Sequence, residues 1–154
     1  LFYATPARLK FLKSERSEAQ ACGDMLTRLA MAHPDVGFSL LSDGRELFTY
    51  PPEQDLLDGR LRRLSAVMGH GFADNALRLD KEREGVRLTG YAALPTFNRG
   101  TSSEQYLFVN NRPVRDKLLL GAVKGAYQDV LAHNRHAVVA LYVDVCAQEV
   151  DVNV

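Results

Sequence analysis

The sequence predicts a mixed α+β fold in which helices pack on one face of a mostly antiparallel sheet. Two kinds of pattern support this prediction. Apolar residues recur at helical spacing in two stretches of the first half. Pairs of short apolar runs with turn residues between them follow each stretch, which is typical of hairpins. We therefore expect the order helix, hairpin, helix, hairpin, strand, helix, strand, strand.

The first predicted helix begins near Ser14 or Ser17 and extends to about His33. Both serines are candidate N-caps, and Ser17 has a glutamine at the capping-box distance. Pro34 ends the helix, because proline has no amide hydrogen and clashes with the preceding turn. The apolar stripe consists of Cys22, Met25, Leu26 and Leu29. We interpret this stripe as core packing.

A hairpin is predicted next, over residues 36–50, because Asp43-Gly44 separates two apolar runs. A second helix follows at residues 57–68 and ends at the glycines that flank His70. We expect its arginines to form a solvated face rather than a binding patch; they are Arg60, Arg62 and Arg63.

The rest of the chain predicts a second hairpin, with strands at residues 78–80 and 86–93, and then a loop at residues 95–103. A strand at residues 105–109 leads to a helix that Asp116 caps and that continues to about Ala132. The residues expected to be buried by this helix are Leu119, Ala122, Val123, Ala126, Val130 and Leu131. Strands at residues 137–145 and 150–154 complete the order.

The bulk composition limits the kinds of function. The 154 residues suit one domain, or one domain and part of a second, and we expect the sequence to be a piece of a longer protein. The formal net charge is +0, so a site for a polyanion must come from local clustering. We expect Cys22 and Cys146 to be buried free thiols, which suits a reducing cytosol. No run is long enough to cross a bilayer.

Sequence motifs for catalysis or cofactor binding are lacking. Neither the GxxxxGK[ST] nor the GxGxxG phosphate-binding pattern occurs. His133 and His136 have no cysteine or carboxylate at metal-ligand spacing, and they read as polar loop residues. No residue set nominates a catalytic triad. We therefore expect no autonomous active site, no metal and no cofactor in this chain.

A basic cluster is the one candidate binding site. Five Lys or Arg residues but only two acids lie between residues 112 and 135. Arginine forks and lysine charges suit phosphate oxygens. The candidate DNA-binding residues are Arg112, Arg115, Lys117 and Lys124. These residues alone leave two interpretations open, a DNA-contact surface and a solvated basic helix end.

Three separated segments resemble the MutL family of DNA mismatch repair proteins. LFYATPARLKFL at residues 1–12 is similar to the family's LFYNTPARxKFL, and FVNNRPVRDK at residues 108–117 is similar to FVNGRPVRDK. VDVNV at residues 150–154 resembles the front of VDVNVHPAK. Asn111 stands where the family has glycine, and asparagine tolerates the left-handed backbone of a turn.

The resemblance implies a transducer domain at residues 14–154, preceded by a remnant of an ATPase domain at residues 1–13. It also implies a ribosomal-protein-like fold with a left-handed β-α-β crossover. ATP and magnesium would be bound by the parent protein of the gyrase, heat-shock chaperone, histidine kinase and MutL superfamily. The lysine of HPAK and the upstream ATPase motifs lie outside this sequence, so we expect the chain alone not to hydrolyse ATP.

The partners that the resemblance implies are double-stranded DNA, a MutS-type mismatch recognition protein and a second copy of the N-terminal region. Lys117 matches a cationic position associated with DNA binding in the family. The implied location is the bacterial cytoplasm, in association with the nucleoid. Two alternatives stay open: a protein interaction module without direct DNA contact, and an enzyme of the related small-molecule kinase superfamily. The kinase alternative requires a phosphate loop, and Arg99–Ser103 is too short for one.

Overall fold

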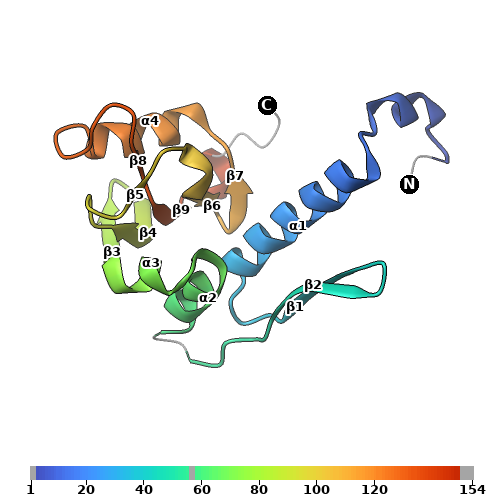
Figure 1. Cartoon of the computed structure of the whole chain (residues 1–154). Coiled ribbons are helices and arrows are strands. Elements are labelled where there is room, and N and C mark those ends of the chain that lie inside the picture. The colour runs from blue at the N-terminus through green and yellow to red at the C-terminus, as the bar shows by residue number, and fades with distance from the viewer. Residues whose placement is uncertain (1–2, 56–57, 150–154) are drawn as a thin grey trace.

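The main body of the molecule is a five-stranded sheet. The computed structural model in Figure 1 describes residues 3–55 and 58–149. The strand order is β3-β4-β9-β6-β7, and all neighbours are antiparallel except β6 with β9. The strands are β3 (Ala76–Arg83), β4 (Val86–Ala93), β6 (Gln105–Val109), β7 (Arg112–Val114) and β9 (Val139–Asp144). The predicted α+β class with a mostly antiparallel sheet is confirmed.

Helices cover both faces of this sheet, so the expectation that they share one face was wrong. The ends of α1 (Glu15–Ala32), α2 (Gly59–Met68) and α3 (His70–Asn75) pack on the face that carries Phe108 and Tyr142. The other face carries Leu107 and Val139 and is covered by α4 (Lys117–Ala126). Figure 1 shows α4 above the sheet and α2 and α3 below it. The central strands are apolar on both faces, and each apolar face must be buried.

Tyr142 lies at the centre of the larger cluster. Its ring stacks on Phe108 of the parallel neighbour β6, with centroids 4.6 Å apart and planes at 8°. Its hydroxyl donates to the carbonyl of Met31 at 2.8 Å, which ties the end of α1 to the sheet. Arg60 of α2 covers the ring at 4.2 Å. Burial raises the pKa of Tyr142 far above that of a free tyrosine.

Strands β4 and β9 approach closely at Gly90. This glycine has φ 123°, and a Cβ atom built there would lie 2.2 Å from the carbonyl oxygen of Ala140. No other residue fits this position without moving the backbone.

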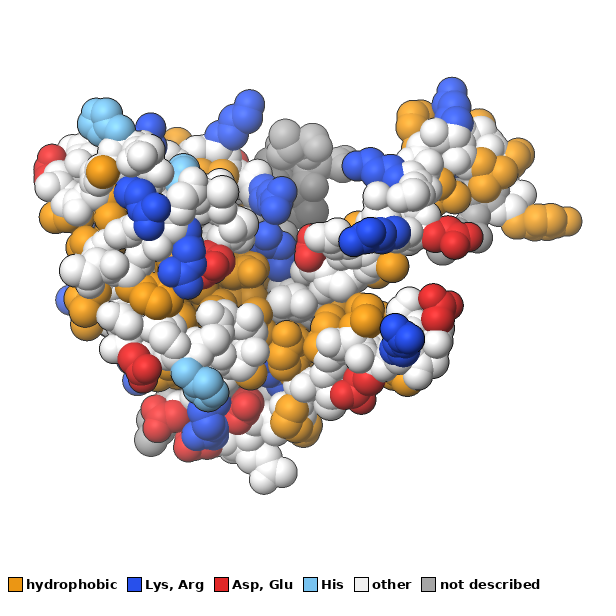
Figure 2. Space-filling view, in the orientation of Figure 1, with side chains coloured by type: hydrophobic (Ala, Val, Ile, Leu, Met, Phe, Trp, Pro, Cys, Tyr) orange, Lys and Arg blue, Asp and Glu red, His pale blue; other side chains and the backbone are white. Residues whose placement is uncertain are grey.

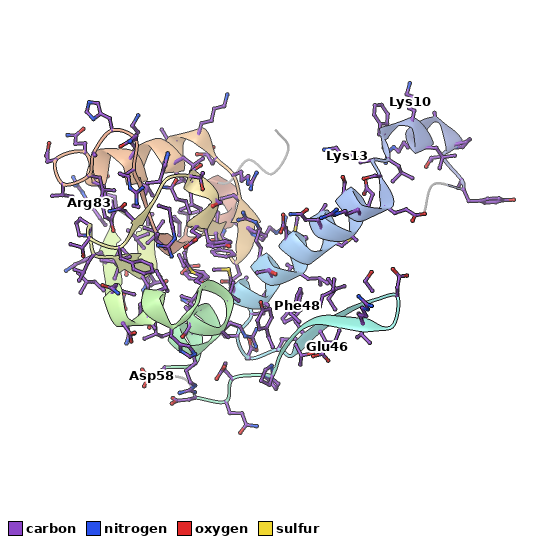
Figure 3. The ribbon with its side chains drawn as sticks, viewed as in Figure 1. Lys10, Lys13, Glu46, Phe48, Asp58 and Arg83 are labelled. Carbon is purple, nitrogen blue, oxygen red and sulfur yellow. The ribbon has the colours of Figure 1, made fainter. Side chains whose placement is uncertain are left out.

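Residues 3–50 form an arm beside the body. The hairpin β1 (Phe38–Ser42) and β2 (Arg45–Tyr50) is a separate two-stranded sheet that runs along α1. Figure 3 shows Phe48 on this hairpin, whereas Lys10 and Lys13 lie near the outer end of the arm. Apolar side chains are exposed along the arm (Figure 2), including Leu9, Phe11, Met25, Leu41 and Leu47. The arm therefore lacks a closed core of its own.

Several predicted boundaries are confirmed. The Ser14 hydroxyl accepts a hydrogen bond from the Ser17 amide at 3.3 Å and caps α1. Asp43 and Gly44 have positive φ values of 50° and 75°, as the predicted hairpin turn requires. The predicted strand at residues 105–109 is β6. The strand predicted at residues 150–154 lies outside the described residues.

Short elements were not predicted from the sequence. They are α3, the pair β5 (Asn98–Arg99) and β8 (His136–Ala137), β7, η2 (Ser102–Glu104) and η3 (Ala147–Glu149). All are two to six residues long, so no periodic pattern can develop within them. The chain also forms the short helix η1 (Pro6–Phe11) before α1.

The fourth helix ends at Ala126, six residues before the predicted end. Tyr127 turns towards the sheet and donates its hydroxyl to the carbonyl of Ala93 at 2.7 Å. Of the residues expected to be buried, Val123 is buried and Leu119 and Leu131 are partly buried. Ala122, Ala126 and Val130 are exposed. The helical pattern was extended through residues that form turns.

Arg63 corrects the expectation of a solvated arginine face. Its side chain is 1% exposed. The guanidinium donates to the carbonyls of Ala30, His33, Pro34, Val36 and Pro51 at 2.7 to 3.4 Å. Burial lowers the pKa of Arg63, although it still carries its charge. It joins the end of α1, the start of the hairpin and α2.

The neighbouring arginines differ from Arg63. Arg62 is exposed and pairs with Glu53 at 2.9 Å and with Asp55 at 3.2 Å, as expected of a solvated face. Both cysteines are exposed and free, whereas burial was expected. For Cys22 the reason is that the stripe on the outer part of α1 is left uncovered. No described helix is both long and apolar enough to cross a membrane.

Candidate nucleic-acid interface

The four predicted basic residues lie on β7, α4 and the link between them. Arg112 begins β7, Arg115 follows it, Lys117 begins α4 and Lys124 lies in its last turn. All four side chains are exposed. Within the described part of the chain, none of them lies within 4.0 Å of a carboxylate in an ion pair. The structure therefore leaves these charges open to a ligand.

Lys117 and Lys124 share one face of α4. Seven residues make nearly two turns of an α-helix, so these side chains point the same way about 10 Å apart. Asp116, the acid nearest in sequence, accepts a hydrogen bond from the Leu119 amide at 2.9 Å. Its carboxylate is engaged in capping the helix and sits where the helix dipole favours a negative charge.

The turn before β7 fixes the position of Arg112. Asn110 and Asn111 both have positive φ, 46° and 62°, so Asn111 keeps the left-handed turn that the family builds with glycine. The Asn110 side chain accepts from the Val145 amide at 3.0 Å and donates to the Val145 carbonyl at 3.1 Å. These bonds hold the tip of the β6–β7 hairpin against the end of β9.

Arg28 of α1 joins this cluster, and the sequence did not nominate it. Its guanidinium lies over the Tyr106 ring at 4.9 Å. Burial first, and then the positive charge of Arg115, lower the pKa of Arg28, while Asp24 opposes this effect. Its Nη1 atom is buried and has no hydrogen-bond partner among the described residues. A buried donor without an acceptor is uncommon in folded proteins.

The sequence contains little to indicate that Arg28 lies near the basic residues of β7 and α4. It lies almost ninety residues before Arg115, on a helix whose other charged residues are three acids and one arginine. Only the packing of α1 beside β7 brings these arginines together. We call Arg28, Arg112, Arg115, Lys117 and Lys124 the basic strip.

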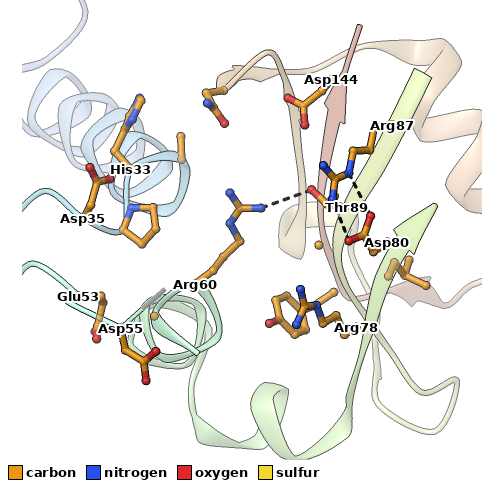
Figure 4. A pocket seen from close by; sticks show the side chains of 17 residues that line it. His33, Asp35, Glu53, Asp55, Arg60, Arg78, Asp80, Arg87, Thr89 and Asp144 are labelled. Atoms are coloured by element: carbon orange, nitrogen blue, oxygen red, sulfur yellow. Dashed lines mark hydrogen bonds and ion pairs between the residues drawn. The ribbon is translucent and has the colours of Figure 1, made fainter. Parts of the chain in front are cut away.

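A second cleft, of about 640 Å³, opens between the end of α1, the start of α2 and strands β3 and β4 (Figure 4). Its charges are of both signs. Arg87 holds Asp80 with bonds of 3.1 and 3.0 Å and lowers the pKa of that carboxyl. Arg60 reaches Thr89 at 3.4 Å. Because its charges are mixed and partly paired, this cleft suits a polyanion less well than the basic strip.

Metal ligation finds no support in the described residues, where no three His, Cys, Asp or Glu side chains are placed to hold an ion. His133 lies in a turn beyond α4, as expected of a loop residue. His136 begins β8 and is partly buried, so its interpretation as a loop residue was wrong.

Comparison with known proteins gives consistent matches. Residues 64–154 match the family model described as the DNA mismatch repair protein, C-terminal domain. The chain is 62% identical over 154 residues to the DNA mismatch repair protein MutL of Phenylobacterium zucineum and 61% identical over 155 residues to that of Rhodospirillum rubrum. Each match covers 100% of this chain and 25% of the relative, so the chain spans about a quarter of their length.

Solved structures show the same fold. The Aquifex aeolicus MutL ATPase domain complexed with ADP has a TM-score of 0.64 and 25% identity, over 95% of this chain and 50% of that one. An N-terminal domain of a DNA repair protein has a TM-score of 0.74 and 22% identity, over 100% of this chain and 50% of that one. The family model and the relatives agree over most of the sequence. This chain therefore belongs to the MutL family of DNA mismatch repair proteins.

Proposed function

We propose that this chain is the transducer part of a MutL-type protein and that its basic strip contacts the phosphates of double-stranded DNA. The observation that carries the proposal is the set of exposed cations on and beside β7 and α4 that form no ion pair among the described residues. Few aromatic side chains interleave with these cations, which favours backbone contact over base stacking. Such contacts hold a duplex without reading its sequence.

The coupling to ATP is part of the same proposal. The Aquifex aeolicus MutL domain of similar fold binds ADP and is about twice as long as the matching region. In the parent protein, ATP and magnesium would be bound upstream, and ATP binding would bring two N-terminal regions together. Two basic strips would then line one groove. The chain itself would hydrolyse no ATP, and a MutS-type protein in the bacterial cytoplasm would supply mismatch recognition.

The boundary between the ATPase part and the transducer part is a second element of the proposal. Residue 14 was the expected start, but the hairpin β1–β2 pairs with no strand of the five-stranded sheet. The family model begins only at residue 64. We propose that the arm belongs with the ATPase part and that the transducer begins near α2, with Arg63 at the junction.

Charge reversal of the basic strip tests the DNA contact. The variant carries Arg112→Glu, Arg115→Glu and Lys117→Glu in the full-length protein. We expect duplex affinity to fall at least a hundredfold at 100 mM salt, since several phosphate contacts are lost and repulsion replaces them. The measurement is fluorescence anisotropy of a labelled 30-base-pair duplex, in the presence of a non-hydrolysable ATP analogue.

The matched control reverses three other exposed cations, with Arg45→Glu, Lys81→Glu and Arg83→Glu. It changes the net charge by the same amount, because both variants replace three cations with three glutamates. Equal loss of affinity in both variants would show that global charge acts and not the basic strip. Unchanged affinity in the first variant, with MutS-type partner capture lost, would favour the interaction module instead.

A further inference from the structure

A groove on the α4 side of the body differs from the basic strip because its floor is apolar. It encloses about 530 Å³ between α4, the turns after it, η2 and β8. Its apolar floor is made of Leu120, Val123, Tyr127, Leu131 and Ala137. Val123 and Ala137 are almost fully buried, at 6% and 5% exposed, and the other three are partly buried. The floor is thus fixed by the smaller core cluster.

The edge of this groove carries basic and histidine side chains. They are Lys124, His133, Arg135 and His136, and no described residue that lines the groove is acidic. Arg135 is held in place, because its guanidinium bonds to the Asn98 side chain and, at 3.4 Å, to the Asn98 carbonyl. These bonds use Nε and Nη2 and fix the plane of the guanidinium, so Nη1 is the nitrogen that is left for a carboxylate at the rim.

An apolar floor within a basic rim selects one class of occupant. A DNA backbone would place charged phosphates over Leu120 and Leu131, which gain nothing from contact with a phosphate. A wholly apolar segment would leave the cations of the rim without partners. A large apolar side chain flanked by carboxylates satisfies both the floor and the rim, since apolar burial supplies affinity and opposite charge supplies register.

We propose that this groove, the α4 groove, binds a partner protein through a short segment in which one large apolar residue lies between Asp or Glu residues. The apolar side chain lies against Leu120 and Leu131, and the flanking carboxylates meet Arg135 and Lys124. This inference does not depend on DNA binding by the basic strip, with which the groove shares Lys124 alone.

A defined set of peptides tests the proposal. The probes are fluorescein-labelled octapeptides with Leu, Ile, Phe or Met between two acidic residues on each side. In the matched peptides, Ser replaces the apolar residue, or Asn and Gln replace the acids. We expect the acidic apolar peptides to bind the full-length protein at micromolar concentration, with at least tenfold weaker binding of both control types. Binding should weaken as salt rises.

Variants locate the binding. Leu131→Asn and Arg135→Glu should each weaken the best peptide at least tenfold. Their controls are Val130→Asn, next to Leu131 but 58% exposed and outside the groove, and Lys81→Glu on β3. These controls should keep full affinity. Arg135→Glu is a surface change, so it remains informative if Leu131→Asn lowers stability.

Three outcomes would overturn the proposal. The first is no binding by any acidic apolar peptide up to 1 mM, and the second is equal binding by all four variants. In the third, Leu131→Asn weakens the 30-base-pair duplex as much as the peptide, which would make the groove part of a nucleic-acid surface. If peptides bind as expected while charge reversal of the basic strip leaves duplex affinity unchanged, DNA binding fails and the groove proposal stands.

Discussion

Arg63 is almost fully buried and Arg28 is partly buried, and the surroundings of these two arginines differ. Arg63 sits at the junction of α1 and α2, and five backbone carbonyls accept its hydrogen bonds. Arg28 lies where α1 passes β7. It has an aromatic ring below it, another arginine beside it and a buried nitrogen without a partner.

The difference separates structural from ligand-binding cations. The carbonyls around Arg63 belong to one helix end and two connecting segments, so the arginine is part of the fold. At Arg28, burial and the charge of Arg115 disfavour the charged form, and Tyr106 and Asp24 oppose them only in part. We propose that a phosphate bound beside these two arginines offsets this cost.

The largest expected effect is the loss of stability when Arg63 is replaced. Arg63→Met keeps the bulk but leaves five carbonyls without donors, so we expect the free energy of unfolding to fall by about 3 kcal/mol or more. Urea unfolding of the full-length protein measures this change. Arg62→Met, one residue earlier and exposed, is the control and should have little effect. If both substitutions behave alike, Arg63 does not join the arm to the body.

The next effect concerns Arg28. Arg28→Gln removes a desolvated charge beside Arg115, so we expect the free energy of unfolding to stay within about 0.5 kcal/mol. Duplex affinity should fall about tenfold, which corresponds to roughly 1.4 kcal/mol for one lost phosphate contact. Arg16→Gln on the outer part of the same helix is the control. A loss of stability without a loss of DNA affinity would show that Arg28 is structural, as Arg63 is.

The smallest expected effect comes from replacing Asp116, which caps α4, the helix that carries Lys117 and Lys124. Asp116→Ala removes the cap of α4, and we expect the free energy of unfolding to fall by about 1 kcal/mol. Asp116→Asn keeps an oxygen acceptor and should restore most of it. Duplex affinity should rise slightly in both variants, because they remove the negative charge of Asp116, which lies next to Arg115 and Lys117 of the basic strip. Lower affinity in Asp116→Asn would show that the carboxylate has a direct role in binding.

The sequence predicted the longer elements and failed where contacts override local pattern. The apolar period predicted α1, the Asp43-Gly44 turn predicted the first hairpin, and a short apolar run predicted β6, all close to their observed bounds. The predicted end of α4 was six residues too late, because Tyr127 turns inwards and donates a hydrogen bond to the carbonyl of Ala93 in β4. No local pattern connects β4 with the end of this helix. Arg63 was read as solvated because its partners are backbone carbonyls, which carry no sequence signal.

The candidate site shows the same limit. The cations on β7 and α4 are close in sequence and could be found there. Arg28 could not, because it joins them only through the packing of α1 beside β7. The α4 groove was equally hidden, since Leu120 and Leu131 face a rim whose Arg135 is fixed by Asn98.

The salt dependence of duplex binding is the sharpest test of whether the basic strip contacts DNA phosphates. Affinity is measured from 50 to 250 mM KCl for the unmodified protein and for a variant with Arg112→Ala, Arg115→Ala and Lys117→Ala. Each phosphate contact adds about 0.9 to the slope of log K against log salt. We expect the slope of the variant to be smaller by about two to three units, since three phosphate contacts are lost. An unchanged slope would contradict it, because the cations of the basic strip would then release no counterions.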